Sequence, residues 1–132
     1  MARDETQEEE RVRAKAEGFE ALSPWLGWVL GPAAWALHQG FGYAMTPMLC
    51  RMGELWPYHA LTVAAVALCA GGALSSGRAL RRSRMVEPER SAERIRMMAL
   101  VGLMLCAGAF GGIALEYAGS FWIDPCAAVL DA

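Results

Sequence analysis

Charged residues are missing from three long stretches of this sequence. Asp, Glu, Lys and Arg make up 20% of its 132 residues, yet none of them lies in 21–50, 55–77 or 97–115. They gather instead in the first 20 residues and in a second block, 78–96. A soluble domain scatters its charges along the chain, so this segregation argues against one. The net charge of −2 is only an average over separate regions.

The sequence also lacks the motifs that mark most enzymes and nucleic-acid-binding proteins. It has no Gly-rich phosphate loop, no Ser–His–Asp set, no zinc-binding Cys/His run and no helical two-histidine motif. The basic block 78–96 has no interleaved aromatic residues and does not predict nucleic-acid binding. The opening of the chain is acidic, whereas a secretory signal begins with basic residues. We therefore expect a non-enzymatic protein whose first apolar run is a retained anchor.

Each uncharged stretch is long enough to cross a bilayer, which takes about 20 residues of helix. We predict an all-α integral membrane fold with spans at about 24–48, 58–76 and 97–119 in a membrane domain, 23–132. Ser23 and Pro24 are typical of a helix start, and Pro32 predicts a bend.

The charged segment 1–22 precedes this domain, and we expect it to lie in the cytoplasm. Residues 5–21 predict a short helix, with Glu8–Arg11 and Glu9–Arg13 at supporting spacing. Such a helix is either simply solvated or docked on a partner.

The distribution of basic residues predicts the orientation of the spans. Four of the twelve Lys and Arg residues lie in the N-terminal segment and seven lie in 78–96, which leaves only Arg51 elsewhere. Basic loops stay in the cytoplasm, so the N-terminus is expected inside and the C-terminus outside, in the periplasm of a bacterial inner membrane. Aromatic residues are expected at both interfaces: Trp25 and Trp28 inside, and Trp56, Tyr58, Phe121 and Trp122 outside.

The second and third spans carry small residues at alternating steps of three and four. Helices in lipid associate through close approach of such residues. The predicted helix-packing residues are Cys69, Gly72, Gly102, Cys106, Ala109 and Gly112. His59 and Glu116 continue these faces toward the outer surface, where we expect them to pair and relieve each other's desolvation. A proton relay is the alternative role of this pair.

Cys50 and Cys126 both follow the outer ends of predicted spans. An oxidising compartment favours a disulfide between them. The competing interpretation is a Cu(I) site, because the nearby run offers the soft ligands Met45, Met48, Cys50 and Met52.

His38, Cys69 and Cys106 are expected at one level near the middle of the membrane. An ionisable residue inside a span normally faces protein or a cavity. Two interpretations stay open: a three-ligand metal site or a haem ligated by His38, against packing cysteines and a neutral, hydrogen-bonded histidine near Gln39 and Tyr43.

The first span contains Pro32-x-x-Trp35-x-x-His38, followed by Tyr43 and Cys50. This pattern resembles small three-span bacterial membrane proteins encoded beside haem–copper cytochrome c oxidase subunits. The resemblance covers about thirty residues, together with length and span count. It implies a non-catalytic accessory or assembly subunit of a terminal oxidase or respiratory supercomplex. Larger membrane subunits would be its partners and would hold the haem and copper, with no cofactor bound by this chain alone.

Other functions remain as alternatives. The three-span haem-anchor subunits of succinate dehydrogenase match in size and span count, but their ligand motifs are not reproduced. A small haem- or copper-binding protein, for electron transfer or metal delivery, would use the metal-ligating sets above. A transporter or channel needs a polar path, for which the spans hold few polar residues.

Overall fold

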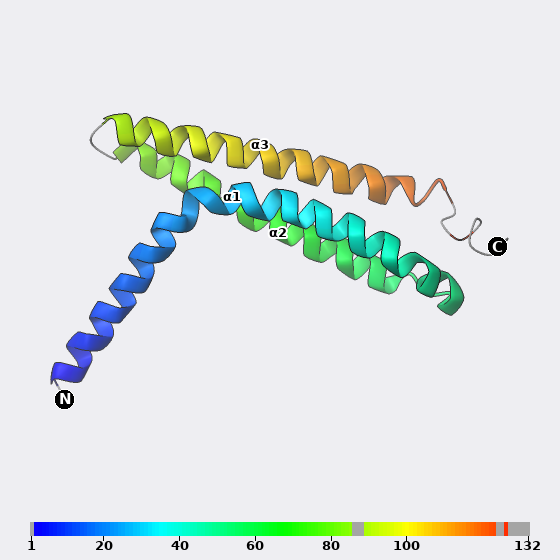
Figure 1. The fold of residues 1–132 in the computed structure, drawn as a ribbon, viewed down its shortest axis with the longest axis horizontal. Helices are drawn as coiled ribbons and strands as arrows, with labels where there is room; N and C mark the ends of the chain where they lie inside the picture. Colours follow the sequence, from blue (N-terminus) through cyan, green and yellow to red (C-terminus); the bar gives the residue numbers. More distant parts are fainter. Residues whose placement is uncertain (1, 86–88, 124–125, 127–132) are drawn as a thin grey trace.

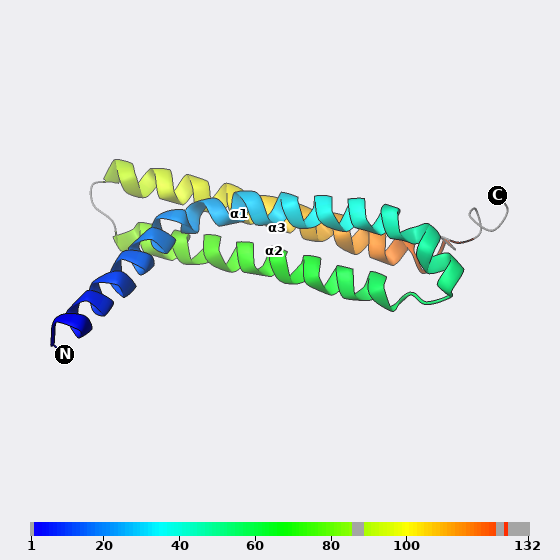
Figure 2. The same ribbon diagram turned by 60° about the horizontal axis from the view of Figure 1, so that its bottom comes forward.

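The computed structural model describes residues 2–85, 89–123 and 126, and there the chain is helical without a strand. Helix α1 spans Ala2–Met52, α2 spans Trp56–Arg82, a short 3₁₀ turn η1 covers Ser83–Met85, and α3 spans Glu89–Gly119. Each helix packs against the other two, and α2 runs antiparallel to α1 and α3 (Figures 1 and 2). The prediction of an all-α fold is confirmed.

Helix α1 is a single helix of 51 residues that contains Pro24, Pro32 and Pro47. The predicted helix start at Ser23 and Pro24 was therefore wrong, and the segment 5–21 is not a separate helix. A proline inside a helix removes one hydrogen bond and bends the axis, but it does not have to end the helix. Figure 1 shows the dark-blue beginning of α1 leaving the bundle at an angle. The Glu8–Arg11 and Glu9–Arg13 pairs lie outside the described side chains.

The arginine-rich block 78–96 is largely helical rather than a loop. Helix α2 continues to Arg82, six residues beyond the predicted span end at Ser76, and α3 begins at Glu89, eight residues before Met97. Arginine and glutamate are good helix formers, so charge does not end a helix where the apolar stretch ends. The Ser83 hydroxyl donates to the Leu80 carbonyl at 2.7 Å, where α2 gives way to η1.

At the opposite end of the bundle, a tight turn joins α1 to α2. Gly53 has a φ of 68°, and its N–H donates to the Leu49 carbonyl at 2.9 Å. Glycine adopts this left-handed conformation without the steric cost of a Cβ, so it ends α1 here. Pro57 lies in the first turn of α2, where its missing N–H costs nothing.

A disulfide joins Cys50, in the last turns of α1, to Cys126 beyond α3, with Cα atoms 5.4 Å apart. The predicted bridge is therefore confirmed. It ties the segment after α3 to the end of the bundle where α1 meets α2.

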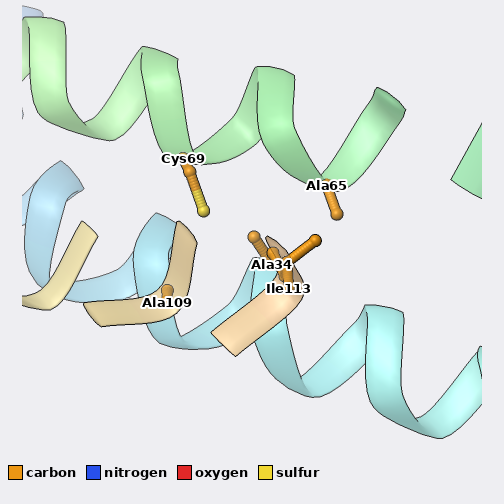
Figure 3. Close-up of a cluster of buried hydrophobic side chains, with 5 residues drawn as sticks. All are labelled: Ala34, Ala65, Cys69, Ala109 and Ile113. Carbon is orange, nitrogen blue, oxygen red and sulfur yellow. The ribbon is translucent and has the colours of Figure 1, made fainter. Parts of the chain in front are cut away.

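The centre of the bundle is built from small side chains. Figure 3 shows a cluster of Ala34 from α1, Ala65 and Cys69 from α2, and Ala109 and Ile113 from α3. Backbones approach closely here because these side chains are short.

Five of the six predicted packing residues are buried along these facing surfaces: Cys69, Gly72, Gly102, Cys106 and Ala109. The sixth, Gly112, is half-buried. A Cβ added at Gly72 would lie 2.8 Å from the Cys106 sulfur. Helix α1 closes the same seam, because a Cβ on Gly31 would lie 3.0 Å from the Cys106 Cα.

The outer surface of the bundle is apolar. Val63, Leu74, Met104 and Leu115 are each more than 60% exposed. Two helical segments, Trp56–Met85 and Glu89–Gly119, are long and apolar enough to cross a membrane, and only 28% of the apolar stretch of each is buried. A core helix of a soluble protein buries most of such a stretch. Outward-facing apolar side chains are instead typical of helices in lipid.

Candidate functional site

A polar cluster lies inside the bundle, toward the disulfide end. His38 of α1 is only 1% exposed, and both of its ring nitrogens have partners. Its Nδ1 lies 3.2 Å from Oε2 of Glu116 on α3, and its Nε2 lies 3.0 Å from the hydroxyl of Thr62 on α2. One histidine therefore connects all three helices.

The Glu116 carboxylate is surrounded by donors from one face of α1. Trp35 donates its indole N–H to Oε1 at 3.2 Å. With its amide nitrogen turned toward the carboxylate, Gln39 also donates to both oxygens, 2.6 Å from Oε2. Trp35, His38 and Gln39 stand at positions i, i+3 and i+4, which share one helix face. Gly112 gives the indole room, because a Cβ there would lie 3.0 Å from the Trp35 ring.

Thr62 extends the cluster toward the backbone of α2. Its hydroxyl donates to the Tyr58 carbonyl at 2.9 Å and lies 3.0 Å from Nε2 of His38. The donor and acceptor roles of the two ring nitrogens depend on the tautomer of His38. In every tautomer the ring has a polar partner at each nitrogen, which lowers the cost of burying it among apolar side chains.

The predicted pair of His59 with Glu116 was wrong. The ring of His59 is bound instead by Tyr117, whose hydroxyl lies 3.0 Å from Nδ1. Successive residues of a helix point about 100° apart. Glu116 therefore faces α1 while Tyr117 faces α2, and shared depth alone does not predict which of them meets His59.

A cavity of about 430 Å³ opens beside the polar cluster. His38 and Glu116 form its polar wall, and most of the remaining lining is apolar or aromatic, including Leu49, Tyr58 and Phe121. The rings of Tyr58 and Tyr117 stack with centroids 6.1 Å apart, and Tyr58 also lies 5.5 Å from the His38 ring. The disulfide borders the cavity through Cys50.

His38, Cys69 and Cys106 do not form a metal site in this structure. His38 lies level with Thr62, which is seven residues from Cys69, or about 10 Å along α2. Cys106 is ten residues from Glu116, or about 15 Å along α3, and its thiol faces the Gly27 carbonyl at 3.5 Å. The predicted common level holds for Cys69 and Cys106, since a Cβ on Gly72, three residues from Cys69, would lie 2.8 Å from the Cys106 sulfur. It was wrong for His38, because α1 continues 14 residues beyond His38 while α2 begins only six residues before Thr62. Over the described residues, no three His, Cys, Asp or Glu side chains converge as metal ligands.

The proposed Cu(I) run does not offer a thiolate, because Cys50 is in the disulfide. Met48 and Met52 are 56% and 49% exposed on the outer surface of α1, and Met45 is half-buried. These thioethers are consistent with ordinary packing at a helix end.

Sequence reasoning identified His38 and Glu116 but did not connect them. The spacing Trp35-x-x-His38-Gln39 places three donors on one face of α1 and was the available signal, whereas the rotation of α3 that turns Glu116 toward them is not readable from the sequence. Comparison with protein-family models, with curated proteins and with solved structures found no match.

Proposed function

We propose that this chain is a three-span protein of a bacterial inner membrane. Helices α2 and α3 are two of the spans. The third is the uncharged part of α1, 24–48, which packs beside both of them. Its outward side chains are apolar, and Val29, Leu37 and Phe41 are each about half exposed. The presence of proline, glycine and histidine lowers the hydropathy of this segment, but proline and glycine are tolerated in membrane helices whose neighbours satisfy the backbone.

The proposed orientation places the arginine-rich connection between α2 and α3 in the cytoplasm. The end of α2, the start of α3 and the start of α1 lie at one end of the molecule, and the last turns of α1, which carry Cys50 of the disulfide, lie at the other (Figure 1). Eleven of the twelve basic residues belong to the first end. Retention of basic segments in the cytoplasm supports this orientation, and a disulfide on the periplasmic side is consistent with it.

We further propose that the protein is a non-catalytic accessory or assembly subunit of a respiratory complex, most specifically a haem–copper terminal oxidase. The observation that carries this proposal is a pair of outward rows of small residues. The rows are Ala60, Ala64, Ala67 and Gly71 on α2, and Ala107, Gly111, Ala114 and Ala118 on α3. They repeat the spacing of the buried seams on the opposite faces of the same helices. Small residues in lipid allow close helix approach, so both rows fit helices of another membrane protein.

The choice of an oxidase as the partner rests on the resemblance of the first span. Three residues of that pattern have internal roles in this chain, since Trp35 and His38 bind Glu116 and Cys50 forms the disulfide. Because both nitrogens of His38 are engaged, the geometry favours a structural role over haem ligation. The resemblance therefore concerns residues that stabilise the fold, and the haem and copper belong to the larger subunits.

The test is to tag the chromosomal copy, extract membranes in mild detergent and follow the protein through native electrophoresis by mass spectrometry. We expect it to migrate with a terminal oxidase. Ala67→Leu and Ala114→Leu should abolish this comigration without changing the melting of the isolated protein, because both positions are exposed. Val63→Leu and Met104→Leu, at exposed positions that already carry large side chains, are the matched controls. Migration of the parent protein apart from every respiratory complex would refute the proposal.

A further inference from the structure

The cavity beside His38 and Glu116 is the one feature of the site that a purely structural role does not use. It has a volume of about 430 Å³, within the range of pockets that hold a small molecule. We propose that it binds the headgroup of a membrane quinone or quinol. This inference rests on the membrane location proposed above, but it does not depend on the identity of the partner complex.

The charge of the cavity wall selects a neutral ligand. No Lys or Arg is among the described residues that line it, so an anion finds no counter-charge. The Glu116 carboxyl group already has partners in Trp35, His38 and Gln39. A cation therefore gains little there. A neutral ring with polar oxygens avoids the cost of burying a charge.

The walls of the cavity fit a flat ring with an apolar tail. Tyr58 and Phe121 supply aromatic surfaces, and Leu49, Leu55 and Ile123 supply aliphatic ones. Aromatic rings pack favourably in offset or edge arrangements, so a quinoid ring has partners on these walls. The outward faces of the helices are apolar, which suits a ligand that arrives from the lipid.

Hydrogen-bonding groups stand beside these walls. Among the described residues, the Tyr58 hydroxyl and Nε2 of His59 have no hydrogen-bond partner in the protein, and both residues line the cavity. A quinone carbonyl can accept from the Tyr58 hydroxyl, and a quinol hydroxyl can donate to an unprotonated ring nitrogen of His59. The proposal concerns binding alone and includes no transfer of electrons.

Gly42 offers a position from which the cavity can be filled without replacing a residue of the polar cluster. It lines the cavity, and a Cβ there would lie at an ordinary contact distance of 3.6 Å from Tyr58. Gly42→Leu should therefore occupy the space that the ring needs. Gly40, two residues earlier on the same helix, is exposed with nothing within 4 Å of a Cβ. Gly40→Leu makes the same chemical change on the lipid side and is the matched control.

The experiment measures quenching of tryptophan fluorescence by decylubiquinone, with the isolated full chain in nanodiscs. Saturable quenching is expected for the parent and for Gly40→Leu, with binding weaker by more than about tenfold in Gly42→Leu. Equal, non-saturable quenching in all three proteins reports only partition into lipid and would overturn the proposal. Because no partner protein is present, this result is independent of whether the chain comigrates with an oxidase.

A second measurement covers the case in which Gly42→Leu does not fold. An azido-substituted quinone is photolysed with the parent protein, and the labelled peptides are identified by mass spectrometry. Labels in 42–49 or 55–59 are expected, since both segments contribute to the cavity. Labels confined to the lipid-facing surface of 63–74 would contradict a site in the cavity.

Discussion

Replacement of Glu116 should reveal how much the polar cluster contributes to the stability of the bundle. Glu116→Leu removes the acceptor for the indole of Trp35, for Nδ1 of His38 and for the amide of Gln39. Hydrogen bonds between membrane helices contribute about 0.6 kcal/mol on average and about 1.7 kcal/mol at most. Three of them give a range of about 2 to 5 kcal/mol. Since 31% of the Glu116 side chain is exposed, water can hydrogen-bond to the donors that lose Glu116, and we expect a loss of about 2 kcal/mol.

Glu116→Gln provides the matched control. A neutral His38 that carries its hydrogen on Nε2 can accept from the new amide, and the amide oxygen can still accept from Trp35. We therefore expect a loss of about 1 kcal/mol or less. His38→Leu combined with Glu116→Leu removes both partners of one bond, so its cost should fall short of the sum of the single changes by about 1 kcal/mol.

The assay is reversible unfolding in mixed micelles with increasing dodecyl sulfate, followed by circular dichroism. The free energy of unfolding of each variant is compared with that of the parent under reducing and non-reducing conditions. The reasoning would be refuted if Glu116→Gln cost as much as Glu116→Leu. Strict additivity of the double variant would equally show that His38 and Glu116 do not interact.

Three further predictions concern packing, the turn and the disulfide. Gly72→Leu should lower the free energy of unfolding by about 1 to 3 kcal/mol, because its Cβ meets the Cys106 sulfur at 2.8 Å, while Gly71→Leu should not, because nothing lies within 4 Å. Gly53→Ala should lower the free energy of unfolding by about 1 to 2 kcal/mol, because Gly53 has a φ of 68°. An unchanged free energy of unfolding would contradict that backbone conformation. Cys50→Ser opens a bridge across 76 residues, worth at most roughly 4 kcal/mol by chain entropy. An impermeant maleimide should label Cys50 and Cys126 of the parent only after reduction, and labelling of Cys126 without reductant would exclude the bridge.

The packing of α2 and α3 was predictable because small residues recur at helical spacing. Close approach in lipid selects such residues, so Gly72 and Cys106 mark their own interface. Helix α1 carries the same signal in Gly27-x-x-x-Gly31, and both glycines meet α3 backbone in the structure. The spacing in α1 was readable too, although sequence reasoning considered only the other two helices.

The residues of the polar site were predictable from the sequence, but the hydrogen bonds between them were not. His38 and Glu116 are polar residues in apolar stretches of the sequence, so each must have a hydrogen-bond partner in the folded protein. Which partners they find depends on the rotation of each helix and on the bend of α1. Neither is encoded in local spacing. The predicted contact of His59 with Glu116 was therefore wrong by one residue on α3, because His59 contacts Tyr117 instead.

Helix ends were predicted least well, for two physical reasons. Pro24 was interpreted as a helix start, but the helix continues through it because a proline only bends a helix that its neighbours support. The arginines after Ser76 were interpreted as a loop, but they extend α2 to Arg82 since charged residues are good helix formers in water. Hydropathy locates the membrane boundary and not the end of the helix.

The number of spans is the central claim, and the location of the two ends of the chain tests it most directly. The measurement is the activity of topology reporters fused at the N-terminus and after Ala132, compared with a fusion within 81–90 in the connection between α2 and α3. Three spans predict that the N-terminus and the connection report from the cytoplasm while the C-terminus reports from the periplasm. If α2 and α3 alone crossed the membrane, both ends would report from the same side, and the account would be contradicted.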